Sequence, residues 1–569
     1  MSIKIRGVKL EVEIKRLKTD ILIVGGGAAG CYGGIKAKEI SEDVDILIVE
    51  KANIKRSGCL GAGISSLNAY LNPGVSAKDF VKYVKEDSEG LIREDLVYSI
   101  AQGVNQVAQD LERWGLPIIK DKAGNYQARG RRSIKIQGEY IKPLLAKQLK
   151  KKGVRVLNRV NISNYLILDN KVKGAFGFST RENKFYLIKA QAVICATGGA
   201  AGIYKPNNPE SRPHRMWYSP FNTGAGYAMG LRAGAEMTTF EMRFIALRTK
   251  DTIAPTGVLA QEFNATQLNA KGEEYQSKYL KNSTPYRLYA TLKENEKGNG
   301  PCYLKLDSVS NKLFTKLQKS FLNMSPEIIL KWADRINQAR ELAVEIVATE
   351  PYLVGGHAQA GYWVDKNRKT TLEGLYAVGD VAGGAPKKYA TGAMVEAKLA
   401  VRAAINNLAK NEVYKLDNQQ IKKEFERVFA PLKRGEGFSY QQLEQRLQKI
   451  MDEYAGGISQ NYKLSPAKLK QAKKLLTGLK KDLAKLVADD FYQLLRAHEV
   501  VDRVIVAQVL IEHLLYRQES RWPGYQKRLD YPKRDDKNWF KFVNSQYDRN
   551  LEEVKIIERE PHEVKLNDN

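Results

Sequence analysis

The segment DILIVGGGAAG, residues 20–30, runs from apolar residues directly into three spaced glycines, Gly25, Gly27 and Gly30. A second apolar run, residues 44–49, ends in Glu50, 20 residues beyond Gly30. A strand, a glycine turn and a helix in this order offer bare backbone amides to a pyrophosphate, and an acid at this distance accepts a hydrogen bond from a ribose hydroxyl. Such a match can be a plain glycine turn, but here strand, helix and acid all agree. The segment predicts a Rossmann-like dinucleotide site in an α/β fold.

A second, distant piece of the same site is TLEGLYAVGD, residues 371–380, which puts Asp380 at the end of a late strand. Residues 192–196 also run into a glycine turn, as expected where the chain crosses the cofactor again. Together these pieces indicate a flavin, FAD, rather than a nicotinamide. Pyrophosphate is assigned to the three spaced glycines, the ribose to Glu50 and the ribityl chain to Asp380. Supporting contacts are expected from Lys51, Ser57, Gly198 and Asn222.

The chain of 569 residues is too long for one core and is expected to hold several domains. Residues 1–250 read as the first part of the FAD-binding domain. Residues 251–348 lose the strand–helix rhythm and read as an inserted α+β cap. The FAD-binding domain resumes over 349–410, so it is discontinuous. Residues 411–569 are predicted to form a C-terminal helical domain and a polar, aromatic tail.

The composition limits the classes of protein to which this chain can belong. The sequence shows no secretory leader and no apolar run long enough to span a membrane, which favours a soluble cytoplasmic protein. No metal site is expected, and an internal iron–sulfur cluster is disfavoured, because the four cysteines are scattered and form no CxxC pair; they are Cys31, Cys59, Cys195 and Cys302. The net charge of +28 suits an anionic substrate and an acidic electron donor, or a Lys-rich solvated surface. Nucleic-acid binding is disfavoured because no motif for it is present.

Several motifs resemble the fumarate reductase/succinate dehydrogenase flavoprotein family. They are GGGAAG at 25–30, ATGGA at 196–200, NAKGE at 269–273 and GLYAVGD at 374–380, with RQESR at 517–521 and DYPKRDDKNW at 530–539 in the tail. The resemblance covers nearly the whole chain. Two departures matter. Arg56 and Ser57 are followed by Gly58, where membrane-bound members carry a flavin-linking His, so the FAD is expected to be bound without a covalent link. The family's dicarboxylate-binding His and Arg motifs are also missing.

Other segments resemble a second branch, the alpha subunits of dissimilatory adenylylsulfate reductases. They are RMWY at 215–218, FNTGAGY at 221–227, FEMRFI at 240–245, EPYLVGGH at 350–357, GYWV at 361–364 and PKKY at 386–389. The chain is shorter than typical members, and its cap looks trimmed. The resemblance implies reduction of adenosine 5′-phosphosulfate to AMP and sulfite, or the reverse, through a sulfite adduct at flavin N5. It also implies an iron–sulfur, ferredoxin-like beta subunit as the electron donor and a small anionic nucleotide as the substrate.

The resemblance further implies a set of site residues. Arg243 and Arg287 match positions near the anionic end, because a guanidinium suits phosphate and sulfo oxygens. His357 would polarise the sulfo group, and Asn68 would donate near the sulfur. The nucleotide pocket is assigned to Tyr83, Glu139, Trp217, Gly257 and Tyr389. Structural roles compete with these assignments: an interface ion pair for either arginine, a core or interface position for His357, a turn for Asn68, core packing for the aromatic residues and a helix start for Glu139.

Two rival hypotheses remain. One is a divergent member of the same superfamily that reduces another small anion, such as fumarate or an enoate. The other is a flavin-bearing electron-transfer or assembly partner without its own substrate. The five histidines are His214, His357, His498, His513 and His562. The last three read as structural or exposed groups in the helical region and tail.

Overall fold

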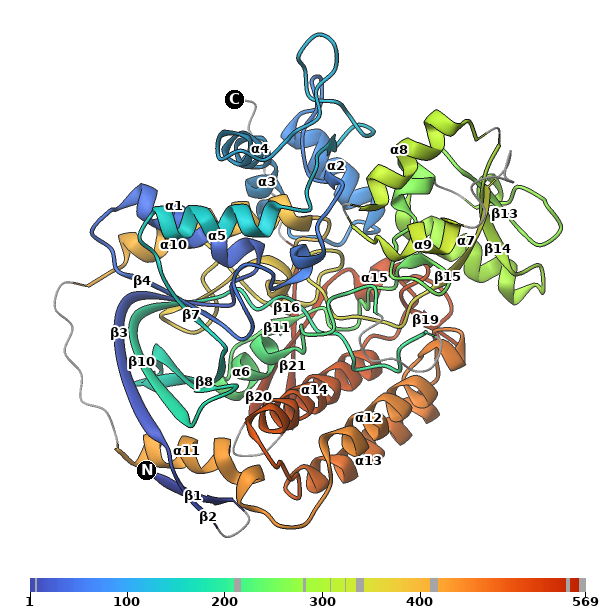
Figure 1. Cartoon of the computed structure of the whole chain (residues 1–569). Coiled ribbons are helices and arrows are strands. Elements are labelled where there is room, and N and C mark those ends of the chain that lie inside the picture. Colours follow the sequence, from blue (N-terminus) through green and yellow to red (C-terminus); the bar gives the residue numbers. More distant parts are fainter. Residues whose placement is uncertain are drawn as a thin grey trace.

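The computed structural model describes residues 1–5, 8–208, 216–279, 283–307, 309–322, 324–333, 342–409, 418–548 and 553–561. Its central element is a seven-stranded sheet (Figure 1). Strand order is β7 (Arg155–Asn158), β4 (Ile46–Glu50), β3 (Glu13–Val24), β10 (Lys184–Cys195), β9 (Lys171–Ser179) and β8 (Val160–Leu168), with β17 (Leu375–Ala377) also on β10.

Strand β10 is shared by two differently built halves of this sheet. It pairs in parallel with β3 along most of its length, and its end pairs in parallel with β17. On the edge opposite β3, the first half of β10 pairs antiparallel with β9. The parallel part is buried on both faces, as the unbroken apolar run of β4 requires. Because β17 comes from residues far downstream, two distant parts of the chain contribute strands to this one sheet.

Helices α1 (Ala28–Ile40), α5 (Ile141–Lys151) and α10 (Tyr389–Asn406) pack together over the parallel strands (Figure 1). Beside them lie α2 (Ala77–Asp87), α3 (Glu94–Ala101) and α4 (Val104–Arg113). The first helix is rich in glycine and alanine, and Gly33 and Gly34 are buried, which lets α1 approach its neighbours closely. The short pair β5 (Ser66–Leu67) and β6 (Ile134–Lys135) completes this layer.

The cap forms a separate antiparallel sheet, coloured yellow-green in Figure 1. Its order is β12 (Leu247–Thr249), β15 (Leu342–Ala348), β14 (Cys302–Leu306) and β13 (Thr266–Leu268). Helix α7 (Thr284–Glu296) packs against β14 and β15, and α8 (Asn311–Leu322) packs against α9 (Glu327–Ala333). Strand β12 starts before residue 251, and the three predicted domain boundaries stay predictions.

The C-terminal region is helical, as expected, and ends in strands. Its helices are α11 (Asn418–Lys433), α12 (Tyr440–Tyr454), α13 (Pro466–Leu483), α14 (Phe491–Tyr516) and α15 (Asp536–Trp539). The tail contributes β20 (Phe542–Asp548) and β21 (Glu553–Arg559) to a sheet with β11 (Met237–Thr238) and β16 (Gly361–Tyr362). Helix α6 (Ala225–Ala233) lies against α14, and β18 (Lys463–Leu464) pairs with β19 (Lys527–Arg528).

The first residues form a hairpin, β1 (Ser2–Ile5) and β2 (Val8–Glu11), that packs near α11 (Figure 1). Within the described ranges, no helix is both long enough and apolar enough to cross a bilayer. The same ranges contain no group of three or more potential His, Cys, Asp or Glu metal ligands.

Candidate active site

The glycine turn after β3 fits a dinucleotide. Gly25 has a φ of +103°, and a β-carbon there would lie 2.5 Å from the carbonyl oxygen of Ala196. A β-carbon on Gly30 would lie 1.9 Å from the carbonyl oxygen of Gly25. Gly27 has open space around it and is the N-cap of α1 without any side-chain capping bond. The helix N-terminus therefore presents uncapped amides to a pyrophosphate, which is the chemistry that FAD requires here.

The predicted supporting residues surround this turn. One Glu50 oxygen accepts a hydrogen bond from the Gly26 amide at 2.7 Å. Ser57 Oγ donates to the Gly26 carbonyl at 3.2 Å. The buried Lys142 ammonium, which sequence patterns did not single out, donates to the same carbonyl. Lys51 forms an ion pair of 2.6 Å with Glu499 on α14, so its contact in this structure is to the C-terminal helices.

Asp380 and Gly198 lie on the second side of the cofactor site. Tyr218 donates its hydroxyl hydrogen to Asp380 at 2.7 Å and also receives a hydrogen bond from Asn222 at 3.2 Å. Gly198 has a φ of +75°, and a β-carbon there would lie 2.4 Å from Asn222 Nδ2. Tyr218 therefore connects the motif that contains Asn222 with the motif that contains Asp380. The sequence motifs alone indicate no role for it.

Gly58 is the position at which the family resemblance would place a flavin-linking His. Its φ is +72°, and a β-carbon there would lie 3.1 Å from Gly27 Cα. The chain at this point is left-handed and close to the glycine turn, a position that favours glycine. No side chain reaches toward the cofactor from residue 58.

His357 lies in a cage of aromatic rings. Its ring centroid is 4.7 Å from that of Phe244, 5.1 Å from Trp217 and 5.2 Å from Tyr389. Burial lowers its pKa, and the charge of Asp380 opposes this shift. Nδ1 is buried and has no hydrogen-bond partner within the described residues. The imidazole is therefore neutral at pH 7 and keeps an unused polar atom.

Arg129 is the residue on which several predicted positions converge, and it was missed from the sequence. Its guanidinium donates to Ser66 Oγ at 2.5 Å, and Ser66 donates to the side-chain oxygen of Asn68 at 2.9 Å. A β-carbon on Gly257 would lie 3.2 Å from Arg129 Nη2. Asn68 and Gly257 therefore flank one partly buried cation from two different parts of the chain.

Arg287 and two tyrosines extend this cation cluster. Arg287 on α7 is 7% exposed, and burial lowers its pKa while Tyr83 and Tyr389 oppose the shift. Burial also raises the pKa of Tyr389 to about 12, against the charges of Arg287 and Arg129. Burial lowers the pKa of Arg129 in the same way. Two desolvated guanidinium groups beside phenol rings attract an anion strongly, because little water screens them.

The turn before α10 places the ring of Tyr389. Lys387 and Tyr389 both have positive φ values, 59° and 49°, although neither is glycine. Such conformations cost about 1 to 3 kcal/mol each and persist where the surroundings impose them. Between the two, Lys388 is fully buried and donates to Gly379, Ala382 and Glu396, each at 3.0 Å. Lys388 thus anchors a strained turn whose outer residues face the site.

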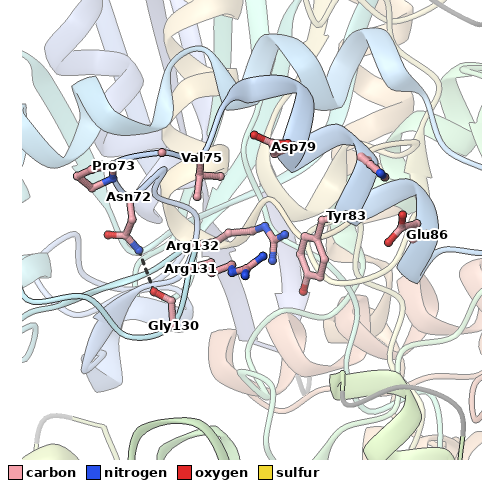
Figure 2. Close-up of a pocket in the computed structure, with 11 residues that line it drawn as sticks. Asn72, Pro73, Val75, Asp79, Tyr83, Glu86, Gly130, Arg131 and Arg132 are labelled. Carbon is pink, nitrogen blue, oxygen red and sulfur yellow. Dashed lines mark hydrogen bonds between the residues drawn. The ribbon is translucent and has the colours of Figure 1, made fainter.

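A surface pocket of about 730 Å³ adjoins this cluster, and Tyr83 forms part of its wall (Figure 2). The carbon at the centre of the Arg132 guanidinium lies 3.8 Å from the Tyr83 ring centroid. Figure 2 shows Arg131 and Arg132 pointing toward Tyr83, while Asp79 and Glu86 lie along the helix above them. The Asp79 carboxylate is engaged in capping α2 with Ser76. Cations therefore line this pocket together with one further carboxylate, that of Glu86.

Glu139 lies between the two parts of the site. Its backbone carbonyl accepts a hydrogen bond of 3.0 Å from Arg56, next to Ser57. Its Oε2 atom is buried without a hydrogen-bond partner among the residues that the structure describes. This leaves a free acceptor, as a ribose or adenine contact would need, and the predicted role stays a prediction.

Arg243 is engaged within the fold. Its side chain is completely buried and donates to the hydroxyl of Tyr204 and to four backbone carbonyls, those of Ala455, Gly456, Tyr462 and Tyr525. The next residue, Phe244, contacts His357. Arg243 therefore joins the FAD-binding part to the C-terminal region, and its hydrogen bonds in this structure are all to the protein itself.

Two other histidines have structural settings. His498 is hydrogen-bonded to the Val428 carbonyl at 2.9 Å, and burial lowers its pKa to about 3. His513 lies between Glu241 and Ser545, at 2.9 and 2.8 Å. His214, His562 and Arg215, the last being part of a quoted segment, lie outside the described residues.

Fold and site together define a flavoprotein that binds FAD through a discontinuous Rossmann-like domain. Residues 20–394 match the family described as FAD binding domain, and residues 444–567 match the fumarate reductase flavoprotein C-terminal family. The chain is 31% identical to adenylylsulfate reductase subunit alpha of Megalodesulfovibrio gigas, with 98% of each protein covered. The chain belongs to the adenylylsulfate reductase alpha-subunit family, and the predicted resemblance and FAD cofactor are confirmed.

Solved structures agree. Adenylylsulfate reductase of Archaeoglobus fulgidus matches with a TM-score of 0.92 and 35% identity over 98% of both chains. The same values apply to an adenosine-5-phosphosulfate reductase in complex with sulfite as a covalent adduct. Escherichia coli quinol fumarate reductase, at 19% identity and a TM-score of 0.81, shares the fold.

Proposed function

We propose that this chain is an FAD-dependent oxidoreductase that interconverts adenosine 5′-phosphosulfate with AMP and sulfite. In the reductive direction, two electrons enter and the bond between sulfur and the bridging oxygen breaks. The oxygen stays on the phosphate, giving AMP, and the sulfur leaves as sulfite. The family membership supports this reaction, and the relative solved with sulfite supports the sulfur chemistry.

One observation within the chain carries the proposal. A neutral imidazole with a buried Nδ1 atom and two guanidinium groups, one buried and one partly buried, lie around a common aromatic space, and that space adjoins the residues that fit FAD. Fixed cations in a dry site stabilise charge that develops in a transition state, because they need no reorganisation. Arg129 and Arg287 are suited to the phosphate and sulfo oxygens. His357 is suited to a hydrogen bond with the sulfo group through its unused nitrogen.

The remaining residues orient the nucleotide. Tyr83, Trp217 and Tyr389 offer ring faces for the adenine, and Asn68 lies one hydroxyl away from Arg129. Glu139 offers an acceptor to the ribose or base, and Gly257 leaves room beside Arg129. Holding the sulfur in one orientation contributes to rate because the reacting atoms then meet without a search. We assign Arg243 to the positioning of this site from behind Phe244, not to substrate contact.

FAD, when bound, supplies the two-electron chemistry. Gly25, Gly27, Gly30 and Glu50 would hold its dinucleotide end, and Asp380 would face the ribityl side. The glycine at position 58 supports binding without a covalent link. The check is denaturation of the yellow protein with acid: the flavin should remain in the supernatant, whereas flavin that pellets with the protein would contradict the proposal.

The test of the reaction uses the purified holoprotein. Added sulfite should decrease the visible absorbance of oxidised flavin, and reduced viologen should be consumed with adenosine 5′-phosphosulfate and not with fumarate. His357→Phe, which keeps the ring packing and removes the nitrogens, should lower turnover with the nucleotide by about 10². Consumption of fumarate instead would support the rival superfamily activity. Sulfite-independent absorbance together with no turnover of either compound would support a flavoprotein without its own substrate.

An iron–sulfur beta subunit is proposed as the electron donor. Two observations support a separate donor: a relative is named as the alpha subunit of its enzyme, and the described residues include no cluster of metal ligands. The measurement is co-purification from the native source, with iron and acid-labile sulfide assayed in the complex. A protein that turns over at full rate with a physiological donor lacking iron would contradict the proposal.

A further inference from the structure

Tyr83 is held by two cations from different parts of the chain. Arg132 lies on its ring at 3.8 Å, on the side of the outer pocket (Figure 2). The Lys387 ammonium lies 3.1 Å from the Tyr83 hydroxyl and 4.5 Å from its ring centroid. The phenol therefore cannot rotate without losing one of these contacts.

Lys387 is itself fixed in place. Its side chain is 8% exposed and forms an ion pair with Asp87, whose side chain is 4% exposed. Asp87 is the last residue of α2, one helical turn after Tyr83, so Lys387 contacts both residues on one helix face. The left-handed backbone at residue 387 turns this side chain toward α2 while Lys388 is turned into the core.

Tyr83 in turn faces the buried cluster. Burial and the neighbouring Tyr389 raise its pKa, and the charges of Arg132 and Arg287 oppose this shift. A rigid aromatic wall at this point determines where a base can stack. Lys387 itself is not among the residues proposed to contact the substrate or FAD.

We propose that Lys387 is a positioning residue for the nucleotide: held by Asp87, it fixes Tyr83 in the orientation that binds the adenine end of the substrate. This inference rests on the proposed function. It assigns Lys387 no contact with the reacting sulfur, so its effect falls on nucleotide binding and not on chemistry at the flavin.

The test is a double-mutant cycle on the holoprotein with Lys387→Met, Tyr83→Phe and the combined variant. Lys387→Met should raise KM for adenosine 5′-phosphosulfate about tenfold with kcat within about twofold, because one charged hydrogen bond is lost. Tyr83→Phe removes the same bond from the other side, so the combined variant should be no worse than the more affected single variant. Lys122→Met, which removes one exposed charge from a turn, is the control and should leave KM unchanged.

A second double variant separates an effect on nucleotide binding from an effect on protein stability. Lys387→Met leaves Asp87 buried without its partner, so Lys387→Met with Asp87→Asn removes both charges and should show the same KM effect in a stably folded protein. Effects of Lys387→Met and Tyr83→Phe that multiply, or a fall in kcat at unchanged KM, would overturn the inference. Failure of the proposed function is distinguishable, because wild type and Lys122→Met would then also lack nucleotide turnover.

Discussion

Two groups of arginines in this protein differ in what surrounds their charge. Arg243 is completely buried and donates to a hydroxyl and four backbone carbonyls between two parts of the chain. Arg129 and Arg287 lie beside phenol rings and donate to the hydroxyls of Ser66 and Thr284, and burial lowers their pKa. The first arrangement binds its guanidinium mainly to backbone within the fold, whereas the second holds desolvated charge next to the aromatic space. Burial alone therefore does not distinguish a structural arginine from one that binds an anion; the groups around it do.

Glu241 is a carboxylate whose charge is matched within the fold. It is completely buried and is bound by His513 at 2.9 Å and Arg517 at 2.7 Å. Arg517 also pairs with Glu519, so charge here is matched by charge within the fold. This network lies where α14 and the tail meet the FAD-binding part. It is expected to act on stability, and the arginines of the aromatic space are expected to act on turnover.

The largest effect is expected from Glu241→Gln, which leaves buried cations without a counter-charge. The free energy of unfolding at pH 7 should fall by about 3 to 5 kcal/mol. Burial raises the pKa of Glu241, but the charge of Arg517 and hydrogen bonds from His513 and Arg517 outweigh it, so the pKa lies below its ordinary value of 4.5. The stabilisation is therefore full above that value and is lost as pH falls through the lower, folded-state pKa.

Urea unfolding across pH measures this prediction. The difference between wild type and Glu241→Gln should be constant near neutrality and should shrink as the solution is acidified below about pH 4.5. Glu182→Gln, on the surface, is the control and should stay within about 0.5 kcal/mol of wild type. A difference that grows toward acid pH would contradict the assignment.

Arg287→Met sharpens the comparison from the catalytic side. The loss of one fixed cation should lower kcat/KM for the nucleotide by about 10² to 10³, because charge in the transition state loses a partner. The midpoint of thermal unfolding should change little, since the methionine fills the same apolar space. Arg402→Met, at an exposed position of α10, should leave both quantities unchanged. A large fall in stability with unchanged turnover would move Arg287 into the structural group.

Arg243→Met is the matched test for the first group. Four backbone carbonyls lose their donor, and the free energy of unfolding should fall by about 3 kcal/mol. At low temperature, the folded variant should still respond to sulfite. Arg16→Met is an exposed control with no expected effect. If Arg243→Met instead abolished turnover in a protein of normal stability, the result would support the substrate contact that the sequence resemblance implies.

The smallest effect is expected from Gly257→Ala. A β-carbon at this position would lie 3.2 Å from Arg129 Nη2, so the guanidinium has to move slightly. KM for the nucleotide should rise about threefold with kcat nearly unchanged. Gly435→Ala, where a β-carbon meets nothing within 4 Å, is the control. An unchanged KM would show that Arg129 is not confined by Gly257.

The cofactor site could be predicted from the sequence because each of its motifs spans only a few consecutive residues. Gly25, Gly27 and Gly30 follow directly from one strand, and Glu50 ends the next. Such a motif fixes backbone geometry over a few residues, so spacing alone carries the information. The link through Tyr218 was not readable, because it depends on how two distant turns meet.

The substrate side was only partly readable because it is assembled from separate segments. Arg129 sits near the end of the loop before β6, and nothing in its sequence neighbourhood marks it out from the other arginines there. Arg243 was expected to face the substrate, and the orientation of a side chain in an irregular segment is not encoded by spacing. His357, Trp217 and Tyr389 do meet, and their roles in binding stay predictions.

The pairing of β20 with β11 has a consequence for biosynthesis. Residues 544 and 545 form the ladder with residues 237 and 238, so more than three hundred residues separate the two partners. During synthesis, β11 cannot form this ladder until residue 545 has left the ribosome. A polypeptide truncated before residue 542 should therefore lack this pairing and leave that edge of β11 without its partner.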